Sequence, residues 1–272
     1  MNVVRSGSLL VDWVTGLGGF PRGHLTELLG PDGCGKTSLL LATAGVVCQA
    51  GGIALYCDLD GLVDPAYAAK LGADAQVLLL HPQGEEELCN VMGAAFNEGW
   101  DLVVIDSTSS LPGAHPAFTL ERLLKIFSLP LVASPTALVM VSRLLDGRPA
   151  GGGSGQRYAS LRLQMAEAVL LRQGRARVGW QLEIHTETNH HAPVVRRSGG
   201  LQLTDAGFDR AWERLRLAQQ MGLVVLSGGY HAGERFIGRS AEEAAASLPG
   251  DIVARLHEEV YGTAQVDGAA LR

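Results

Sequence analysis

Lysine is scarce in this chain, and long uninterrupted apolar segments are missing. Of 22 basic residues only Lys36, Lys70 and Lys125 are lysines, and the formal net charge is −6. A negative net charge argues against a protein that binds nucleic acid over its whole surface, but it allows a local basic groove. The longest apolar stretch, Leu129–Val141, is short and interrupted by polar residues and proline, so no membrane association is expected.

Cysteine is also rare, and its spacing excludes further classes of protein. Cys34, Cys48, Cys57 and Cys89 have no metal-ligand spacing, which favours buried thiols of a cytosolic protein over a disulfide scaffold. The N-terminus lacks a basic segment followed by an apolar one, so no secretory signal is expected and the expected location is the cytoplasm. Glycine, in contrast, is abundant at 35 residues spread among apolar runs, which indicates many tight turns.

Short apolar strands alternate with helical segments through the first half of the chain. This alternation predicts an α/β fold with a mostly parallel central sheet that is covered on both faces. The helices expected here are Lys36–Gln49, Pro65–Leu71, Glu85–Glu98 and Leu120–Ser128. Strands follow at Ala168–Gln173, Gly179–His185 and Val194–Leu203, and the pattern changes from Phe208. We expect a core over residues 1–206 and a small α+β C-terminal domain over residues 207–272.

One glycine-rich segment carries a phosphate-binding pattern. Residues 30–37 read G-x-x-x-x-G-K-T and join an apolar strand to an apolar helix, which is the context that this pattern requires. Glycines let backbone N–H groups turn toward phosphate oxygens, and a helix N-terminus favours an anion. Lys36 is expected at the β- and γ-phosphates of ATP, and Thr37 at Mg²⁺. The expected nucleotide-binding residues of the loop are Gly30, Pro31, Asp32, Gly33, Cys34, Gly35, Lys36, Thr37 and Ser38.

An acidic residue ends a later buried strand. Asp106 closes the apolar run Leu102–Asp106 about 70 residues beyond the loop, which suits the carboxylate that binds Mg²⁺ through water in a phosphate-loop site. Alone, the same pattern is also that of a helix cap. The presence of the loop is what favours the magnesium role.

With these residues in hand, the chain resembles the bacterial RecA recombinase family over nearly its whole length. The matching stretches are residues 6–9, 18–23, 64–72, 101–107, 158–162 and 192–193, in addition to the loop. The most specific is D-P-x-Y-A-x-K-L-G from Asp64 to Gly72, which generic phosphate-loop proteins lack. The resemblance implies a RecA-like fold, ATP-dependent assembly on single-stranded DNA and strand exchange. It also implies that Asp64 contacts the adenine amino group and that Tyr67 stacks on adenine, with packing of Tyr67 on the sheet as the alternative.

Two positions of the hydrolytic site depart from the family pattern. Asp60 stands where the family has its water-activating glutamate, and its shorter side chain changes the reach to the attacking water. The family's γ-phosphate-sensing glutamine corresponds to Ser142–Arg143, where Arg143 either stabilises phosphate charge or points to solvent. Asp60 and Lys36 are the expected catalytic residues, and we expect slow turnover.

Two further departures concern neighbouring subunits. The family's paired lysines, which enter the next subunit's ATP site, are replaced by Glu187 and Asn189, and a glutamate that faces a triphosphate would be repelled. The family's N-terminal helix and strand, which dock on the adjacent subunit, are not found before Ser6. Long filaments of this chain alone are therefore not expected.

The family's two DNA-binding loops are both altered. The first is reduced to a short segment between Ser110 and Thr119, whereas the second survives as a glycine-rich segment with Arg143, Arg148 and Arg157. These arginines either follow a phosphate backbone or are incidental to a surface loop.

A polar strand face adds one more possibility. Glu183, His185, Glu187 and Asn189 would share that face, with His190 and His191 beyond it. The set resembles metal ligands, although exposed polar strand faces are common.

The sequence supports two functions that use ATP and Mg²⁺. The first is a DNA-dependent ATPase of DNA recombination or repair that binds single-stranded DNA. The second is a weakly hydrolysing ATP-binding accessory protein that regulates or loads a partner, either a RecA recombinase or a repair polymerase. A small-molecule kinase is disfavoured because no arginine-rich lid insertion is present.

Overall fold

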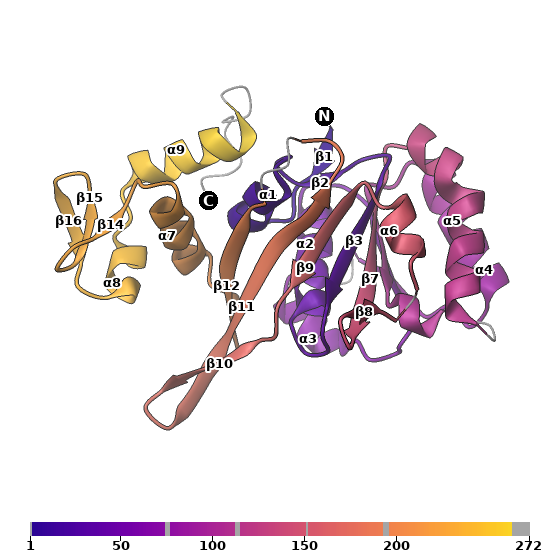
Figure 1. Ribbon diagram of the computed structural model, residues 1–272, viewed down its shortest axis with the longest axis horizontal. Helices are drawn as coiled ribbons and strands as arrows, with labels where there is room; N and C mark the ends of the chain where they lie inside the picture. Colours follow the sequence, from indigo (N-terminus) through magenta and orange to yellow (C-terminus); the bar gives the residue numbers. More distant parts are fainter. Residues whose placement is uncertain (1, 74–76, 112–114, 151, 193–195, 263–272) are drawn as a thin grey trace.

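The computed structural model describes residues 2–73, 77–111, 115–150, 152–192 and 196–262. Its centre is an 11-stranded sheet with the order β13-β12-β11-β9-β3-β7-β6-β4-β5, while β8 and β10 pair beside β7 and β11 (Figure 1). The parallel strands are β3 (Leu25–Gly30), β4 (Ala54–Asp58), β5 (Leu78–Leu80), β6 (Leu102–Asp106), β7 (Ala137–Leu145) and β9 (Leu161–Met165). The antiparallel extension beyond β9 comprises β10 (Val169–Gln173), β11 (Ala176–Asn189), β12 (Ser198–Thr204) and β13 (Gly207–Phe208), and β8 (Arg148–Pro149) pairs antiparallel with β7.

Helices cover both faces of the parallel part, and this explains why its strands carry apolar residues on both faces. Along β4, Tyr56 belongs to the core on one face, and Leu55 and Cys57 belong to the core on the other. Strands that are buried on both faces lose the usual alternation of apolar and polar residues. The first face holds α1 (Leu9–Thr15), α2 (Lys36–Gln49) and α3 (Pro65–Lys70); the second holds α4 (Glu85–Glu98), α5 (Pro116–Ala133) and α6 (Ser154–Tyr158).

The C-terminal part of the chain forms a smaller lobe beside β12 (Figure 1). It contains α7 (Arg210–Gln220), β14 (Val225–Leu226), β15 (Tyr230–Ala232), β16 (Arg235–Gly238), α8 (Ala241–Ala246) and α9 (Gly250–Tyr261). Glu213 of α7 accepts hydrogen bonds from the Ser8 hydroxyl (2.8 Å) and the Leu10 amide (3.0 Å), so α7 is tied to the core. The proposed domain boundary after residue 206 falls between β12 and β13, and residues 263–272 lie outside the described part.

The predicted α/β class with a mostly parallel sheet is confirmed, and α2 and α4 have the predicted bounds. The helix predicted at Leu120–Ser128 is longer, because Pro116 occupies its first turn, where no N–H is needed, and buried Leu131 continues its apolar face beyond Pro130. β12 begins at Ser198 rather than Val194, and residues 193–195 lie outside the described part. The pair β1 (Val3–Val4) and β2 (Phe20–Pro21) completes the fold. No helix within the described residues is long and apolar enough to span a bilayer.

Candidate nucleotide-binding site

A cavity of about 760 Å³ lies where β3, β4, β6 and β7 end. This edge of a parallel sheet is where α/β proteins bind ligands, and the volume suits a nucleotide-sized molecule. The predicted residues that line it are Asp32, Gly33, Cys34, Gly35, Lys36, Thr37, Ser38, Asp60, Asp64, Tyr67, Asp106 and Arg143. The structure therefore brings the phosphate loop and the more distant predicted residues to one cavity.

The phosphate loop takes a shape that only glycine allows at several positions. Gly33 and Gly35 have φ angles of 73° and 87°, in the left-handed region that side chains disfavour. A Cβ atom on Gly35 would lie 2.7 Å from Leu182 Cδ1, and one on Gly30 would lie 2.6 Å from Cys34 Sγ. The loop leads directly into α2, whose N-cap Gly35 makes no side-chain cap hydrogen bond, and the N–H groups of a helix's first turn favour a bound anion. This cradle fits the phosphates of ATP.

The Lys36 side chain folds back onto carbonyl groups of the phosphate loop. Its ammonium donates to the carbonyl oxygens of Gly30 (2.9 Å) and Pro31 (2.6 Å) and lies 3.5 Å from Cys34 Sγ. Burial raises the pKa of the Cys34 thiol, so Cys34 is an apolar packing residue of the loop. Neutral carbonyl partners are weaker than phosphate oxygens, and Lys36 can exchange one for the other.

Three side chains converge on the predicted magnesium position. The Thr37 hydroxyl donates to Asp106 Oδ2 at 2.6 Å, and the Tyr56 hydroxyl donates to the same oxygen at 2.6 Å. Burial raises the pKa of Asp106, while its bonds to Thr37 and Tyr56 lower that pKa. Hydroxyl and carboxylate oxygens are ligands that Mg²⁺ prefers, and Mg²⁺ needs few protein ligands when phosphates supply the others. The donor set of Thr37 and Asp106 fits Mg²⁺.

Asp60, the predicted base, has three partners. The Ser107 hydroxyl donates to Asp60 Oδ2 at 3.1 Å, the Ser110 hydroxyl donates to Oδ1, and the Arg143 guanidinium lies 3.0 Å from Oδ2. Its backbone position is set by Asp58 at the end of β4, which accepts from the amides of Gly61 (2.9 Å) and Val63 (2.8 Å). The Asp60 carboxylate is thus held at the cavity wall by donors to both of its oxygens.

Asp64 and Tyr67 both line the cavity. Asp64 caps α3, and its Oδ1 accepts from the Ala66 amide at 2.9 Å. The Tyr67 hydroxyl lies 2.7 Å from Ser38 Oγ, on the first turn of α2. This bond fixes a half-exposed aromatic ring beside the loop, so both the stacking and the packing interpretations stay open.

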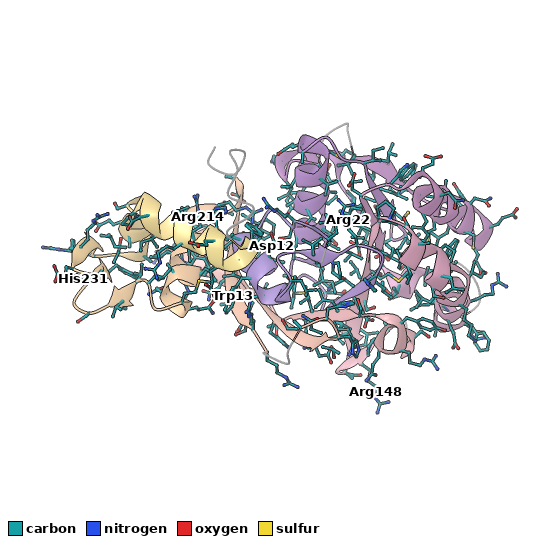
Figure 2. The ribbon with its side chains drawn as sticks, turned by 90° about the horizontal axis from the view of Figure 1, so that it is seen from above. Asp12, Trp13, Arg22, Arg148, Arg214 and His231 are labelled. Carbon is teal, nitrogen blue, oxygen red and sulfur yellow. The ribbon has the colours of Figure 1, made fainter. Side chains whose placement is uncertain are left out.

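The predicted DNA-contact arginines have different surroundings. Arg143 is paired with Asp60 and with Asp32, whose Oδ1 lies 3.4 Å from its Nε. Arg157 is paired with Glu121 of α5 at 3.0 Å. Arg148 projects away from the molecule (Figure 2) and has no ion-pair partner within the described part of the chain. The glycines at 152 and 153 belong to this segment, whereas residue 151 lies outside the described part.

Glu187 and Asn189 are bound within their own chain. Glu187 Oε2 lies 3.0 Å from the Arg162 guanidinium, and the Asn189 amide donates to the Thr15 carbonyl at 2.7 Å. Arg162 in turn donates to buried Glu27 at 2.7 Å, which also accepts from Ser142 at 2.7 Å. The metal-ligand interpretation of this strand is wrong for the part described, in which no three His, Cys, Asp or Glu side chains cluster as ligands would.

Comparisons with known proteins agree with this geometry. A model of the RecA N-terminal domain matches residues 1–116. Protein RecA 1 of Myxococcus xanthus is 30% identical over 289 residues, which cover 96% of this chain and 84% of that protein. The chain belongs to the RecA family. Protein RecA of Bacillus subtilis (strain 168) is 29% identical over 287 residues, covering 96% of this chain and 82% of that protein. Protein RecA of Bifidobacterium breve is 30% identical over 254 residues, covering 85% of this chain, which spans only 65% of that protein's length.

Three site residues escaped the sequence prediction. The Tyr56 hydroxyl donates to Asp106, and the sequence indicates this only by placing a residue with a polar hydroxyl within an apolar strand. Asp58 accepts an amide hydrogen bond from the loop that carries Asp60, but in the sequence it shows only as the last residue of a strand. Ser110 binds Asp60, and the polar run that follows Asp106 was the available signal.

Proposed function

We propose that this RecA-family chain binds ATP–Mg²⁺ in the cavity at the phosphate loop and acts in DNA recombination or repair in the cytoplasm. In this proposal it is a slow, DNA-dependent ATPase that contacts single-stranded DNA. Lys36 binds the β- and γ-phosphates, Thr37 and Asp106 bind Mg²⁺, and Asp64 and Tyr67 bind adenine. Bound Mg²⁺ would neutralise charge on the phosphate oxygens.

The observation that carries the proposal is the contact between Thr37 and Asp106. The two residues are far apart in sequence, yet their oxygens lie 2.6 Å apart beside the glycine cradle. A chance glycine-rich turn has no reason to meet a buried carboxylate at the end of β6, which is separated from β3 by β7 in the sheet. ATPase turnover with and without single-stranded DNA, together with a sizing measurement, tests the proposal. Absence of ATP binding by calorimetry would reject it.

Slow hydrolysis follows from the surroundings of Asp60. Its side chain is short, and its oxygens are engaged by Ser107, Ser110 and Arg143. A base must lie within hydrogen-bond reach of the attacking water, and these donors compete with that water for the carboxylate oxygens. Asp60→Asn is expected to lower the turnover and Asp60→Glu to raise it. Turnover by Asp60→Asn that equals the wild-type rate would exclude Asp60 as the base.

For DNA, the proposal depends mainly on the segment between β7 and α6. Arg148 has no ion-pair partner among the described residues, and Arg157 would have to leave Glu121 to meet a phosphate. Contact by Arg143 stays a prediction with less support, because that residue faces the nucleotide cavity. Titration of a fluorescent oligonucleotide at two salt concentrations tests this: Arg148→Ala should weaken binding more than Arg157→Ala, and salt should weaken both steeply. Binding to neither oligonucleotide nor duplex at low salt would contradict DNA contact.

The alternative is an accessory protein that binds ATP and regulates or loads a RecA recombinase or a repair polymerase. One surface favours it. Phe118, Ile126, Leu129 and Val132 of α5 are between 51% and 81% exposed, and exposed apolar side chains in such number on one helix are typical of protein contacts. Strong ATP binding with negligible turnover, whether or not single-stranded DNA is present, would select this alternative.

A further inference from the structure

A second cleft, of about 640 Å³, lies where the core meets the C-terminal lobe, and it shares no described lining residue with the nucleotide cavity. Its walls come from α1, the start of β12, the end of α7 and α9, and Trp13 marks the junction in Figure 2. Among the described lining residues, the cations are Arg196, Arg197 and Arg255, and the acid is Glu259. The cleft is therefore positively charged in a chain whose net charge is −6.

The three arginines are not neutralised within the described part of the chain. Arg196 and Arg255 are exposed and make no ion pair there, although Glu259 stands one helical turn beyond Arg255 on α9. Arg197 donates from Nη1 to the Trp13 carbonyl at 2.9 Å, and its guanidinium lies 4.9 Å from the centre of the Trp13 ring. A guanidinium has several N–H donors, so these contacts position Arg197 and leave donors for a ligand.

The rest of the lining is neutral, and a hydrogen bond joins two of its walls. Gln220 Nε2 donates to the Ser198 carbonyl at 2.8 Å, which ties the end of α7 to the start of β12. The negative end of the α7 dipole lies at Gln220 and lowers the cost of gathering cations in this cleft. Half-buried Met221 and Leu223 add apolar surface, and the volume is that of a small-molecule site. A matching ligand has a multiply charged anionic group and an apolar or aromatic part.

We propose that this cleft binds the phosphate group of a nucleotide-sized ligand through Arg196, Arg197 and Arg255, with the ligand's apolar or aromatic part beside Met221 and Leu223. A phosphate suits the arginines better than a carboxylate does, because it carries up to about two negative charges near neutral pH and offers several acceptor oxygens to guanidinium forks. The site does not depend on the proposed ATP site. Its lining has one carboxylate and no glycine cradle, so it should bind phosphate more weakly than the phosphate loop binds ATP–Mg²⁺.

Adenosine monophosphate and inorganic phosphate are the probes, each titrated by calorimetry into the wild-type and Lys36→Ala proteins. We expect adenosine monophosphate to bind both proteins equally, because Lys36 belongs to the other cavity, and more tightly than inorganic phosphate, which lacks an apolar part. In the Lys36→Ala background, Arg196→Ala and Arg255→Ala should each weaken its binding about tenfold, since each removes a charged hydrogen bond to the phosphate. Arg235→Ala removes another exposed arginine of the same lobe and should change nothing.

Three results would overturn the proposal. Adenosine monophosphate that loses its affinity in Lys36→Ala binds at the phosphate loop instead. Equal affinities in Arg196→Ala, Arg255→Ala and Arg235→Ala would show that the cleft arginines do not contact it. A single-stranded oligonucleotide whose binding the first two substitutions weaken, with no binding of adenosine monophosphate, would make the cleft a surface for a nucleic-acid strand. Failure of the wild-type protein to bind ATP would reject the proposed function and leave this inference standing.

Discussion

Two groups of charged residues differ in whether their side chains can exchange their present partners for a ligand. At the cavity, Lys36 rests on the carbonyls of Gly30 and Pro31, and Arg143 rests on Asp60 at a partly exposed site. On β3 itself and the adjoining strands β9 and β11, Arg162 is bound to Glu27 and Glu187, with side-chain exposures of only 7% for Arg162 and 2% for Glu27. The first, open group has exchangeable partners, whereas the second is a closed network inside the fold.

This difference explains the departures at Glu187 and Asn189. In the sequence, they read as residues that would meet a neighbour's triphosphate. In the structure, Glu187 pairs with Arg162 and Asn189 with the Thr15 carbonyl, so both are engaged inside their own chain. The positive charge for a phosphate then has to come from the open group, which is where Lys36 and Arg143 lie.

The largest expected effect comes from breaking the closed network. Arg162→Ala should lower the free energy of unfolding by about 3–5 kcal/mol, because it leaves the Glu27 carboxylate buried without its cation. ATP affinity of the folded protein should change little. Arg22→Ala is the control: it removes a partly exposed ion pair to Asp101, of comparable length at 2.6 Å, and it should cost about 1 kcal/mol or less. Urea unfolding measures both, and equal losses would contradict the distinction.

A second closed network joins the core to the C-terminal lobe at Asp12, on α1 (Figure 2). Asp12 accepts from the Ser6 amide at 2.9 Å and from the Tyr261 hydroxyl at 2.6 Å, and burial raises its pKa from 3.8 to about 7. A carboxyl with a raised folded-state pKa holds its proton more tightly when folded. Its contribution to stability is therefore complete below pH 3.8 and is lost as the pH rises through about 7.

Asp12→Asn should remove this pH dependence, which amounts to at most about 4 kcal/mol between the two limits. The difference between wild-type and variant unfolding free energies, measured by urea titration across that range, isolates the contribution of Asp12 from other carboxyls. Parallel pH profiles for the two proteins would show that Asp12 titrates normally.

In the open group, Lys36→Ala should reduce ATP–Mg²⁺ affinity by about a hundredfold, because it removes the cation that faces the β- and γ-phosphates. The melting temperature without nucleotide should hardly change, since the ammonium meets loop carbonyls and a thiol rather than a carboxylate. Lys125→Ala, on the exposed surface of α5, is the matched control. Calorimetry with unchanged affinity in Lys36→Ala would reject the site.

Tyr56 shares a feature with each group: it is buried like the closed network, and its hydroxyl binds Asp106 at the cavity. Tyr56→Phe removes only the hydroxyl that donates to Asp106. We expect the Mg²⁺ concentration needed for half-maximal ATP binding to rise several-fold, with nucleotide binding at saturating Mg²⁺ nearly unchanged. A uniform loss of affinity at every Mg²⁺ concentration would indicate a packing defect instead.

The sequence predicted the parts of the site that depend on local pattern. The loop at Gly30–Thr37 and the strand that ends in Asp106 are continuous stretches, and their bounds came directly from apolar runs and glycine spacing. Side-chain contacts between different strands could not be predicted, because no local sequence pattern indicates that Tyr56 contacts Asp106 or that Arg162 contacts Glu187. β9 was missed for a different reason: the five residues between α6 and β10 are too few to show a periodicity.

The most direct test asks whether one chain holds every charge that its nucleotide site needs. It is an ATP titration by calorimetry at protein concentrations that span about two decades, with sizing of the same samples. We expect one ATP per chain, an unchanged dissociation constant on dilution, and monomers or small oligomers throughout. Binding that appears only where the chain assembles into long filaments would contradict this account, because a neighbouring copy would then complete the site.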